Sequence, residues 1–331
     1  MLGSPHLPLI NAAFANVAIA QIHLNSLMLD RNLPSVSSPV EASLAANKPV
    51  VALESTVIAH GLPRPSNLET SQRLEQITRE EGITPATIAV IDGKLCVGLE
   101  EHQIEFLANT VDIKKLSTRD LAIAVARGWN GATTVAATTW IAHRVGIQVF
   151  ATGGIGGVHR GSLPDVSAVL PELARTPMIV VCSGAKIVLE LPATREWLET
   201  HSITVVGYGC DEMPAFYSRV SGLPVDVQSD SPEEIVQIFK TQRELGLRSA
   251  LLVTVPVPSE AEVPLELLSQ TLDRSLDDAR EEKVTGCNLT PFLLARMAEL
   301  SEGATLRANI ALLENNARVA ALIARALSAE S

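Results

Sequence analysis

The stretch VFATGGIGGVHRGSLPDVSAVL at residues 149–170 joins an apolar, strand-like run to a glycine-rich loop that also carries His159, Arg160, Asp165 and Ser167. Glycines let a backbone approach a ligand closely and turn its N–H groups toward an anion. The aspartate, serine and histidine add metal-ligand and hydrogen-bonding groups. Such a loop is expected to serve no packing purpose. The stretch therefore predicts a phosphate or metal pocket at the end of a buried strand.

Apolar, strand-like runs alternate along the chain with amphipathic, helix-like runs. The strand-like runs cover residues 50–53, 87–91, 149–152, 178–182, 204–208 and 250–255. The helix-like runs cover residues 68–81, 119–127, 185–200, 232–245 and 264–282, and residues 291–328 are expected to form two helices interrupted at 301–303. This alternation is typical of a sheet with helices on its faces. The sequence thus predicts an α/β fold of three α/β/α layers, with a mainly parallel or mixed central sheet.

The chain is expected to divide into a short extension and one large domain. Residues 1–45 are predicted to be a variable N-terminal extension, in which Asp30 and Arg31 are the only charges before the final ten residues. The extension lacks the basic start of a secretory signal and the several arginines of a mitochondrial presequence, although organellar targeting stays open. Residues 46–328 contain no repeat or linker and are predicted to form a single domain.

Composition excludes some classes of partner. Of the 331 residues, 47% are hydrophobic and 3% aromatic, which predicts a core of Ala, Val, Leu and Ile. A net charge of −11 disfavours binding to nucleic acid or anionic lipid, because these partners normally need a basic face. No apolar run reaches the roughly 20 residues that span a bilayer. We therefore expect neither a nucleic-acid nor a membrane partner.

The cysteines are Cys96, Cys182, Cys210 and Cys287, and they form neither a Cys-x-x-Cys pair nor a zinc pattern. This spacing favours reduced thiols in a cytoplasmic enzyme.

Two ionisable side chains follow apolar strands. Lys186 comes after the Ser183-Gly184 turn and is expected to open a helix, whose positive end would disfavour the charged amine and favour a nucleophile. Glu54 ends a buried strand, where apolar surroundings would raise its pKa and let it carry a proton near neutral pH. Position alone favours an exposed helix lysine at 186, and it leaves Glu54 equally open to a cap or a surface ion pair.

Five sequence blocks together resemble one enzyme family. They are VALESTVIAHGLPRPSN at 51–67, NGATTVAATTWIA at 130–142, VVCSGAKIVLEL at 180–191, GYGCDEMPAFYSR at 207–219 and TPFLLARMAEL at 290–300. Their content and order resemble the pseudouridine-5'-phosphate glycosidase family, also called the indigoidine synthase A-like family, and the similarity runs from about Asn47 to about Leu327. The resemblance implies a homotrimeric pseudouridylate synthase. Such an enzyme reversibly cleaves the C–C glycosidic bond of pseudouridine 5'-phosphate to uracil and ribose 5-phosphate through a lysine imine.

The resemblance also implies roles for individual residues. Lys186 matches the lysine that forms an imine with ring-opened ribose 5-phosphate, and Glu54 matches the proton donor. Asp165 matches the ligand of one Mn²⁺ ion per subunit. The matches to substrate-binding positions are Lys115, Val135, His159, Ser167, Ala168, Val169 and Asn309, of which Asn309 is expected to hydrogen-bond the uracil.

Ordinary structural explanations stay open at several of these positions. Asp165 is also typical of a turn or a helix cap, and Ser167 of a cap. His159 and Arg160 suit the phosphate or the uracil, although the histidine could equally satisfy a backbone carbonyl. Unaided, Lys115 is an ordinary surface cation.

The chain departs from the family pattern at two places. Val169 stands where the family pattern Asp-x-Ser-Ala-Asp-Leu has its second carboxylate, which predicts weaker metal binding. Cys287 and Asn288 follow Gly286 where the family usually has Gly-Lys, so a basic residue is missing. Two alternatives therefore stay open, namely a Schiff-base lyase acting on another sugar phosphate or C-nucleotide, and a non-catalytic sugar-phosphate-binding protein.

Overall fold

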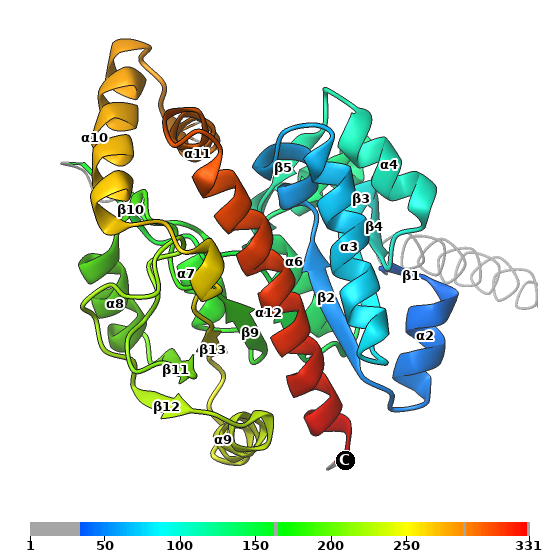
Figure 1. Ribbon diagram of the computed structural model, residues 1–331. Helices are drawn as coiled ribbons and strands as arrows, with labels where there is room; N and C mark the ends of the chain where they lie inside the picture. The colour runs from blue at the N-terminus through cyan, green and yellow to red at the C-terminus, as the bar shows by residue number, and fades with distance from the viewer. Residues whose placement is uncertain (1–33, 162–164, 287–288, 330–331) are drawn as a thin grey trace, which may run out of the picture.

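The computed structural model describes residues 34–161, 165–286 and 289–329 (Figure 1). The strands are β1 (Ser35–Val36), β2 (Val50–Glu54), β3 (Thr84–Ile91), β4 (Lys94–Val97), β5 (Lys114–Leu116), β6 (Gly131–Thr133), β7 (Val149–Ala151), β8 (Val158–His159), β9 (Ile179–Cys182), β10 (Leu189–Glu190), β11 (Thr204–Tyr208), β12 (Val227–Ser229) and β13 (Leu251–Thr254). The helices are α2 (Ser38–Ala45), η1 (Val57–Gly61), α3 (Ser66–Glu80), α4 (Glu101–Asn109), η2 (Thr118–Asp120), α5 (Leu121–Arg127), α6 (Val135–Arg144), α7 (Val169–Leu173), α8 (Leu191–Thr200), α9 (Pro232–Glu244), η3 (Ser259–Ala261), α10 (Leu265–Glu281), α11 (Leu289–Leu300) and α12 (Ala304–Ala329).

One 11-stranded sheet organises the fold. Its main order is β1-β4-β3-β2-β7-β9-β13-β11-β12, while β6 joins β3 and β5 joins β6. Neighbours from β3 through β2, β7, β9, β13 and β11 to β12 are parallel. By contrast, β3 pairs with β4 and with β6 in the antiparallel sense. The predicted mixed, mainly parallel sheet is therefore confirmed.

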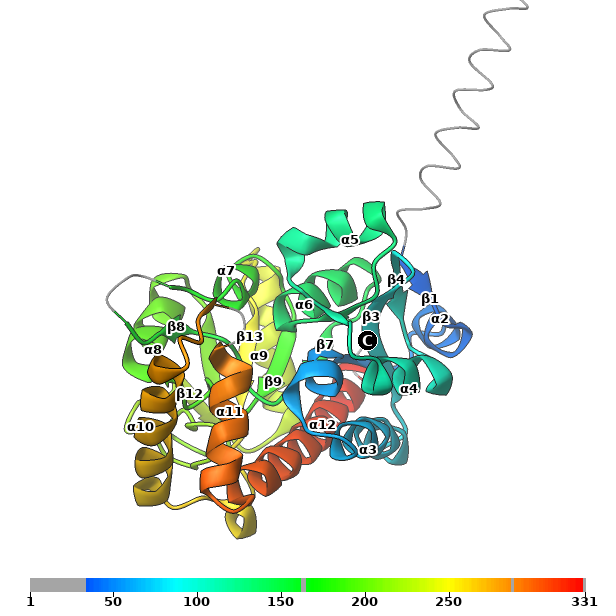
Figure 2. The ribbon, with the colours of Figure 1, turned by 90° about the horizontal axis from the view of Figure 1, so that it is seen from above.

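Helices cover both faces of the sheet. Helix α12 packs against β2, β7 and β9 and contacts α3 and α9 beside it, while α6 packs against β2 and β3. Figure 2 shows α12 and α3 on one side of the strands and α6 on the other. Because both faces are covered, β7 and β9 are buried along their whole length, as the apolar runs at 149–152 and 178–182 predict. The three-layer α/β/α class is confirmed.

The predicted strands and most predicted helices lie where the sequence places them, and residues 291–328 do form two helices, α11 and α12. Strand β4 is an addition that the alternation does not predict. It returns antiparallel to β3 through Asp92-Gly93, which have φ values of 47° and 71°. An Asp-Gly pair tolerates two such left-handed residues and is the signal of a tight hairpin.

The helix expected over residues 185–200 is wrong over residues 185–190, because α8 begins at Leu191. The backbone of Lys186 instead donates a hydrogen bond to Ile155 O at 3.3 Å, and residues 189–190 pair with β8. The backbone of these residues therefore forms loop and strand hydrogen bonds instead of helical ones. Pro192, in the first turn of α8, suits a helix start that needs no N–H donor.

Residues 34–45 of the predicted extension belong to the described fold. Strand β1 pairs with β4, and α2 packs against β2 and β3. Residues 1–33 lie outside the described residues. No helix in the described ranges combines the length and the apolarity needed to cross a membrane.

Candidate active site

A pocket at the carboxyl ends of β2 and β7 brings four predicted site residues together. Glu54 ends β2, Lys186 follows β9, Lys115 lies in β5 and Asn309 lies in α12. Parallel sheets gather ligands at this edge, where their loops converge. The other lining residues are Thr56, Val57, His60, Gly61, Gly153, Gly154, Phe216, Thr290, Pro291, Leu294 and Leu313.

Glu54 is a buried carboxyl group, with 9% of its surface exposed. The Thr152 hydroxyl donates a hydrogen bond of 2.5 Å to Glu54 Oε1. Burial raises the pKa of Glu54, and the charges of Lys186 and Lys115 and the Thr152 hydrogen bond offset this only in part. The carboxyl group therefore holds a proton to a higher pH than an exposed glutamate does, as a proton donor requires.

Lys186 lies on a turn that is joined to the glycine loop. Beyond the ends of β7 and β9, Ser183 N–H donates to Gly153 O at 2.8 Å, and Ile155 N–H donates to Gly184 O at 3.0 Å. The two loops thus run side by side as an extension of the sheet. This pairing places the partly buried Lys186 beside Gly153 and Gly154, in the same pocket as Glu54.

Phe216 forms an apolar wall of the pocket in an unusual backbone conformation. Its φ is 65°, in the left-handed region that bulky residues rarely adopt, and its N–H donates to Ser183 O at 3.0 Å. A Cβ atom on Gly154 would lie 2.7 Å from the Phe216 ring, and one on Gly184 would lie 1.9 Å from Pro214 O. These two glycines therefore allow the loop that carries Phe216 to pack directly on the Lys186 turn.

The glycine loop also serves packing, contrary to the expectation from its composition. A Cβ atom on Gly156 would lie 2.2 Å from Ser167 Oγ, and one on Gly157 would lie 2.3 Å from Thr194 Oγ1. The loop can run this close to Ser167 and Thr194 only with glycine at these positions. The predicted phosphate-binding Ser167 is thereby brought against the same loop whose Gly153 and Gly154 line the pocket.

The other predicted contacts on residues 158–169 lie beside the pocket and do not line it. Val158 and His159 pair with β10, and His159 N–H donates to Asp165 O at 2.8 Å. Ala168 is exposed just before α7, whereas Val169 is only 6% exposed and packs in the core. The side chain of Val169 therefore has a packing role, and its burial makes the position unfavourable for a carboxylate.

Arg160 and Val135 likewise do not line the pocket. Arg160 donates to Leu189 O at 3.1 Å and lies 3.6 Å from a Glu190 oxygen. Val135, the first residue of α6, is 3% exposed and belongs to the hydrophobic core. Cys287 and Asn288, the second departure from the family pattern, lie outside the described residues.

Asp165 is the predicted metal ligand, and it is exposed. The described residues contain no group of three His, Cys, Asp or Glu side chains that could hold a metal ion. A divalent ion at Asp165 would therefore lack a set of three such side chains from the described residues and would need water and substrate oxygens among its ligands. Mn²⁺ accepts hard oxygen ligands of this kind. The donor set fits an ion that binds together with a phosphorylated substrate, not a closed metal site.

Asn316 is a supporting residue that the sequence reasoning missed. This fully buried side chain of α12 donates to Thr152 O at 2.8 Å and to Ser183 Oγ at 3.1 Å, and accepts from Ser183 at 3.2 Å. It thus ties α12 to the ends of both loops. An asparagine within the apolar face of a long helix is the signal that could have found it.

We expect Asn316→Ala to lower the free energy of unfolding by about 2 kcal/mol, because it leaves buried carbonyl and hydroxyl groups without their partner. Turnover should fall as well, since Thr152 orients Glu54. Urea denaturation and steady-state kinetics measure both effects. Asn315→Ala is the control, because the one side-chain hydrogen bond of Asn315 to another described residue is long, 3.4 Å to Pro256 O. Equal losses of stability in the two variants would contradict the supporting role of Asn316.

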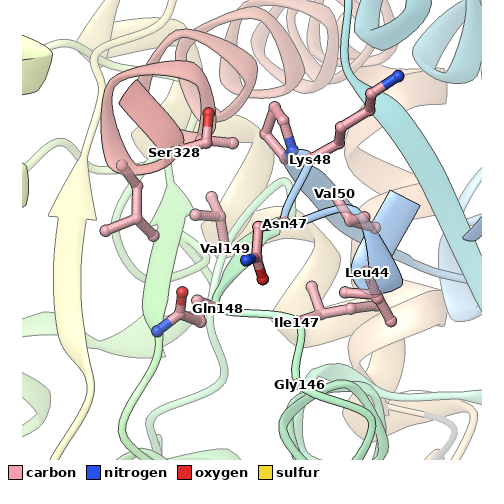
Figure 3. A pocket seen from close by; sticks show the side chains of 12 residues that line it. Leu44, Asn47, Lys48, Val50, Gly146, Ile147, Gln148, Val149 and Ser328 are labelled. Atoms are coloured by element: carbon pink, nitrogen blue, oxygen red, sulfur yellow. The ribbon is translucent and has the colours of Figure 1, made fainter. Parts of the chain in front are cut away.

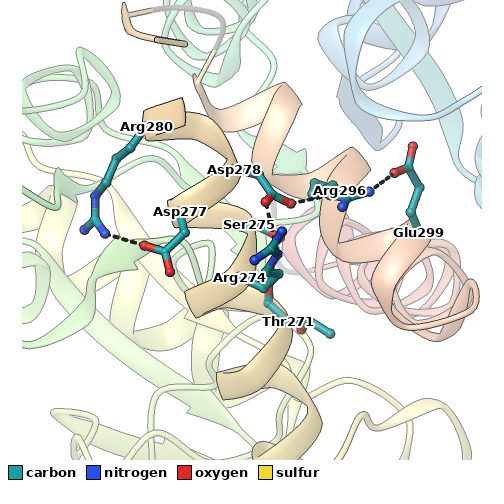
Figure 4. Close-up of polar contacts among 8 residues, drawn as sticks. All are labelled: Thr271, Arg274, Ser275, Asp277, Asp278, Arg280, Arg296 and Glu299. Carbon is teal, nitrogen blue, oxygen red and sulfur yellow. Dashed lines mark hydrogen bonds and ion pairs between the residues drawn. The ribbon is translucent and has the colours of Figure 1, made fainter. Parts of the chain in front are cut away.

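Helix α11 closes one side of the pocket through Thr290, Pro291 and Leu294. An ion-pair cluster fixes α11 to α10, as Figure 4 shows. The buried carboxylate of Asp278 accepts from Arg296 Nε at 2.6 Å and lies 3.1 Å from Arg274 Nε. This cluster fixes the position of α11, and its residues do not line the active-site pocket.

A second pocket lies at the opposite edge of the sheet (Figure 3). Lys48, Val50, Gly146 and Gln148 at the amino ends of β2 and β7 line it, together with Ser328 near the end of α12. None of the predicted site residues lines it. We therefore place the active site at the carboxyl edge.

Comparison with known proteins gives consistent matches. Residues 39–326 match the family model described as indigoidine synthase A like protein. A protein named pseudouridine-5'-phosphate glycosidase from Petrotoga mobilis is 46% identical over 292 residues, which cover 88% of this chain and 95% of the relative.

Two solved structures share the fold. The prealnumycin C-glycosynthase AlnA, in complex with ribulose 5-phosphate, has a TM-score of 0.83 at 37% identity, covering 90% of this chain and 98% of that one. An indigoidine synthase A-like protein from Thermotoga maritima has a TM-score of 0.82 at 40% identity, covering 89% of this chain and 97% of that one.

Proposed function

This chain belongs to the indigoidine synthase A-like protein family, and on that basis we propose that it reversibly cleaves pseudouridine 5'-phosphate to uracil and ribose 5-phosphate. The observation that carries the proposal is the meeting of Lys186 and the buried Glu54, whose pKa is raised by burial, in one pocket. Relatives named for this activity and a neighbour bound to a sugar phosphate support the same substrate class.

The bond to be broken joins C1′ of the ribose to C5 of uracil, and no heteroatom leaving group is available. Glu54 gives its proton to the ring oxygen as the C1′–O4′ bond breaks, and the Lys186 amine bonds to C1′. The bound amine then gives one proton to the Glu54 carboxylate, and its lone pair forms an iminium group while the C1′–C5 bond breaks. The electron pair of that bond stays with uracil, and Glu54 passes the proton to uracil C5. Water hydrolyses the iminium group, which releases ribose 5-phosphate and restores Lys186.

The surrounding residues position the two ends of the substrate. Lys115 and Asn309 supply hydrogen-bond donors for the uracil carbonyls. Ser167 and the backbone of the glycine loop provide donors suited to the phosphate. Mn²⁺ bound at Asp165 would supply positive charge for the phosphate and sugar oxygens.

Borohydride trapping separates this activity from its alternatives. Incubation with ribose 5-phosphate and borohydride should reduce the imine and leave a covalent adduct, and addition of uracil without borohydride should give pseudouridine 5'-phosphate. An adduct without uracil-dependent synthesis would favour a Schiff-base lyase with another substrate. Reversible binding without an adduct would favour a non-catalytic sugar-phosphate-binding protein.

We expect Asp165→Asn to raise the Mn²⁺ concentration for half-saturation by about 10-fold or more, because the charged oxygen ligand is lost. Calorimetric titration of Mn²⁺ with ribose 5-phosphate present measures the affinity independently of turnover. Glu190→Gln, which removes a carboxylate from the adjacent β10, is the matched control and should leave the affinity unchanged. Wild-type affinity in Asp165→Asn would place the metal elsewhere.

A further inference from the structure

His60 occupies a place in the pocket that neither the sequence reasoning nor the mechanism above uses. It lies in η1, one turn beyond Glu54, and lines the pocket with Lys115 and Asn309. Its Nε2 atom is buried, and no group in the described part of the chain hydrogen-bonds it. Such an atom costs free energy unless a ligand or water pairs with it.

The hydrogen bonding of the imidazole defines what Nε2 can do. The backbone of Ile113 favours the protonated ring, which indicates an acceptor beside one ring nitrogen. Because Nε2 has no partner among the described residues, Nδ1 is the nitrogen that faces this acceptor. Burial and the charge of Lys115 lower the pKa of His60, so the ring is neutral near pH 7. A neutral ring with its proton on Nδ1 leaves Nε2 as a lone-pair acceptor.

His60 shares the pocket with residues assigned to the base. The charge of Lys115 lowers the pKa of His60 and also acts on Glu54, so Lys115 lies near both groups. His60 lines the same pocket as Lys115 and Asn309, the two residues that the proposed function assigns to the uracil. Lysine and asparagine supply donors for carbonyl groups there, and an acceptor for an N–H group is the complement that a uracil ring needs.

We propose that His60 Nε2 accepts a hydrogen bond from a ring N–H of the uracil and so selects and positions the base. The inference rests on the proposed function. A C5-linked uracil carries N–H groups at both N1 and N3, whereas a base linked through N1 has lost one of them. An acceptor beside Lys115 and Asn309 that pairs with N1–H is thus suited to a C-nucleotide. His60 is a positioning residue and takes no part in imine formation.

The test compares His60→Phe with His60→Gln during synthesis from uracil and ribose 5-phosphate. Phenylalanine fills the ring space without an acceptor, whereas the Gln Oε1 oxygen restores one near the Nε2 position. We expect His60→Phe to raise KM for uracil by about 10-fold or more. KM for ribose 5-phosphate and borohydride trapping at Lys186 should stay at the wild-type level, and His60→Gln should recover much of the uracil KM. Thermal unfolding checks that both variants are folded.

The outcomes separate the two proposals. Unchanged uracil KM in folded His60→Phe, with an active wild type, would overturn the role of His60 and leave the proposed function intact. A rise confined to the KM for ribose 5-phosphate, with less trapping, would mean that Nε2 accepts from a sugar hydroxyl, which also overturns the inference. A wild-type enzyme without uracil turnover would overturn both proposals.

Discussion

Lys186→Ala should abolish turnover and borohydride trapping while the protein stays folded. The expected loss is complete because only a primary amine at this position can form the imine with the sugar. Lys186 lies on a turn, where its partly buried side chain carries little of the packing. The substitution should therefore change the urea denaturation midpoint only slightly. Lys186→Arg keeps a positive charge without a nucleophilic amine and should be equally inactive.

Lys115→Ala is the matched control, because Lys115 is the other lysine among the pocket's described lining residues. It should weaken substrate binding and still allow trapping by Lys186. Trapping that persists in folded Lys186→Ala and disappears in Lys115→Ala would move the nucleophile to Lys115.

Glu54→Gln should reduce turnover by about 10²- to 10⁴-fold, the range associated with general acid catalysis. The amide keeps the shape and can still accept the hydrogen bond from Thr152, but it cannot give up a proton to the ring oxygen. Binding of ribose 5-phosphate should therefore persist, and kcat should fall much more than KM rises. A kcat at the wild-type level would place the proton donor elsewhere.

The pKa of Glu54 gives this variant a second, independent signature. Because folding raises that pKa above its ordinary value of 4.5, the folded state binds more protons than the unfolded state, and stability contributed by this group is lost as pH rises through the folded-state pKa. Below pH 4.5 the contribution is fully present. Relative to the wild type, Glu54→Gln should thus gain stability as pH rises from that value. A pH-independent difference in the free energy of unfolding would contradict the raised pKa of the buried carboxyl group.

The sequence predicts the layered fold well because strand alternation and strand burial are local patterns. Glu54 and Lys186 come at or just after the ends of predicted strands, and they meet because parallel strands end at one edge of the sheet. No strand pattern places Lys115 and Asn309 beside them, so these two residues could be identified only through the family resemblance. All four residues line one pocket.

What the sequence misses depends on contacts between distant segments. The expected helix at Lys186 fails because the backbone of Leu189 and Glu190 is a strand paired with β8, which lies about 30 positions earlier in the chain. The pairing of Asn316 with Thr152 spans 164 positions, so no local pattern identifies it. The packing role of Gly156 and Gly157 likewise appears only once Ser167 and Thr194 are placed against them.

The most direct measurement is mass spectrometry of the protein after incubation with ribose 5-phosphate and borohydride, followed by proteolysis. We expect one adduct per chain, with the mass of a reduced ribose 5-phosphate imine, on the peptide that contains Lys186. Uracil added before borohydride should lower its yield, because synthesis consumes the imine. An unmodified Lys186 in protein that still makes pseudouridine 5'-phosphate from uracil and ribose 5-phosphate, or an adduct on another lysine, would contradict catalysis through an imine at Lys186.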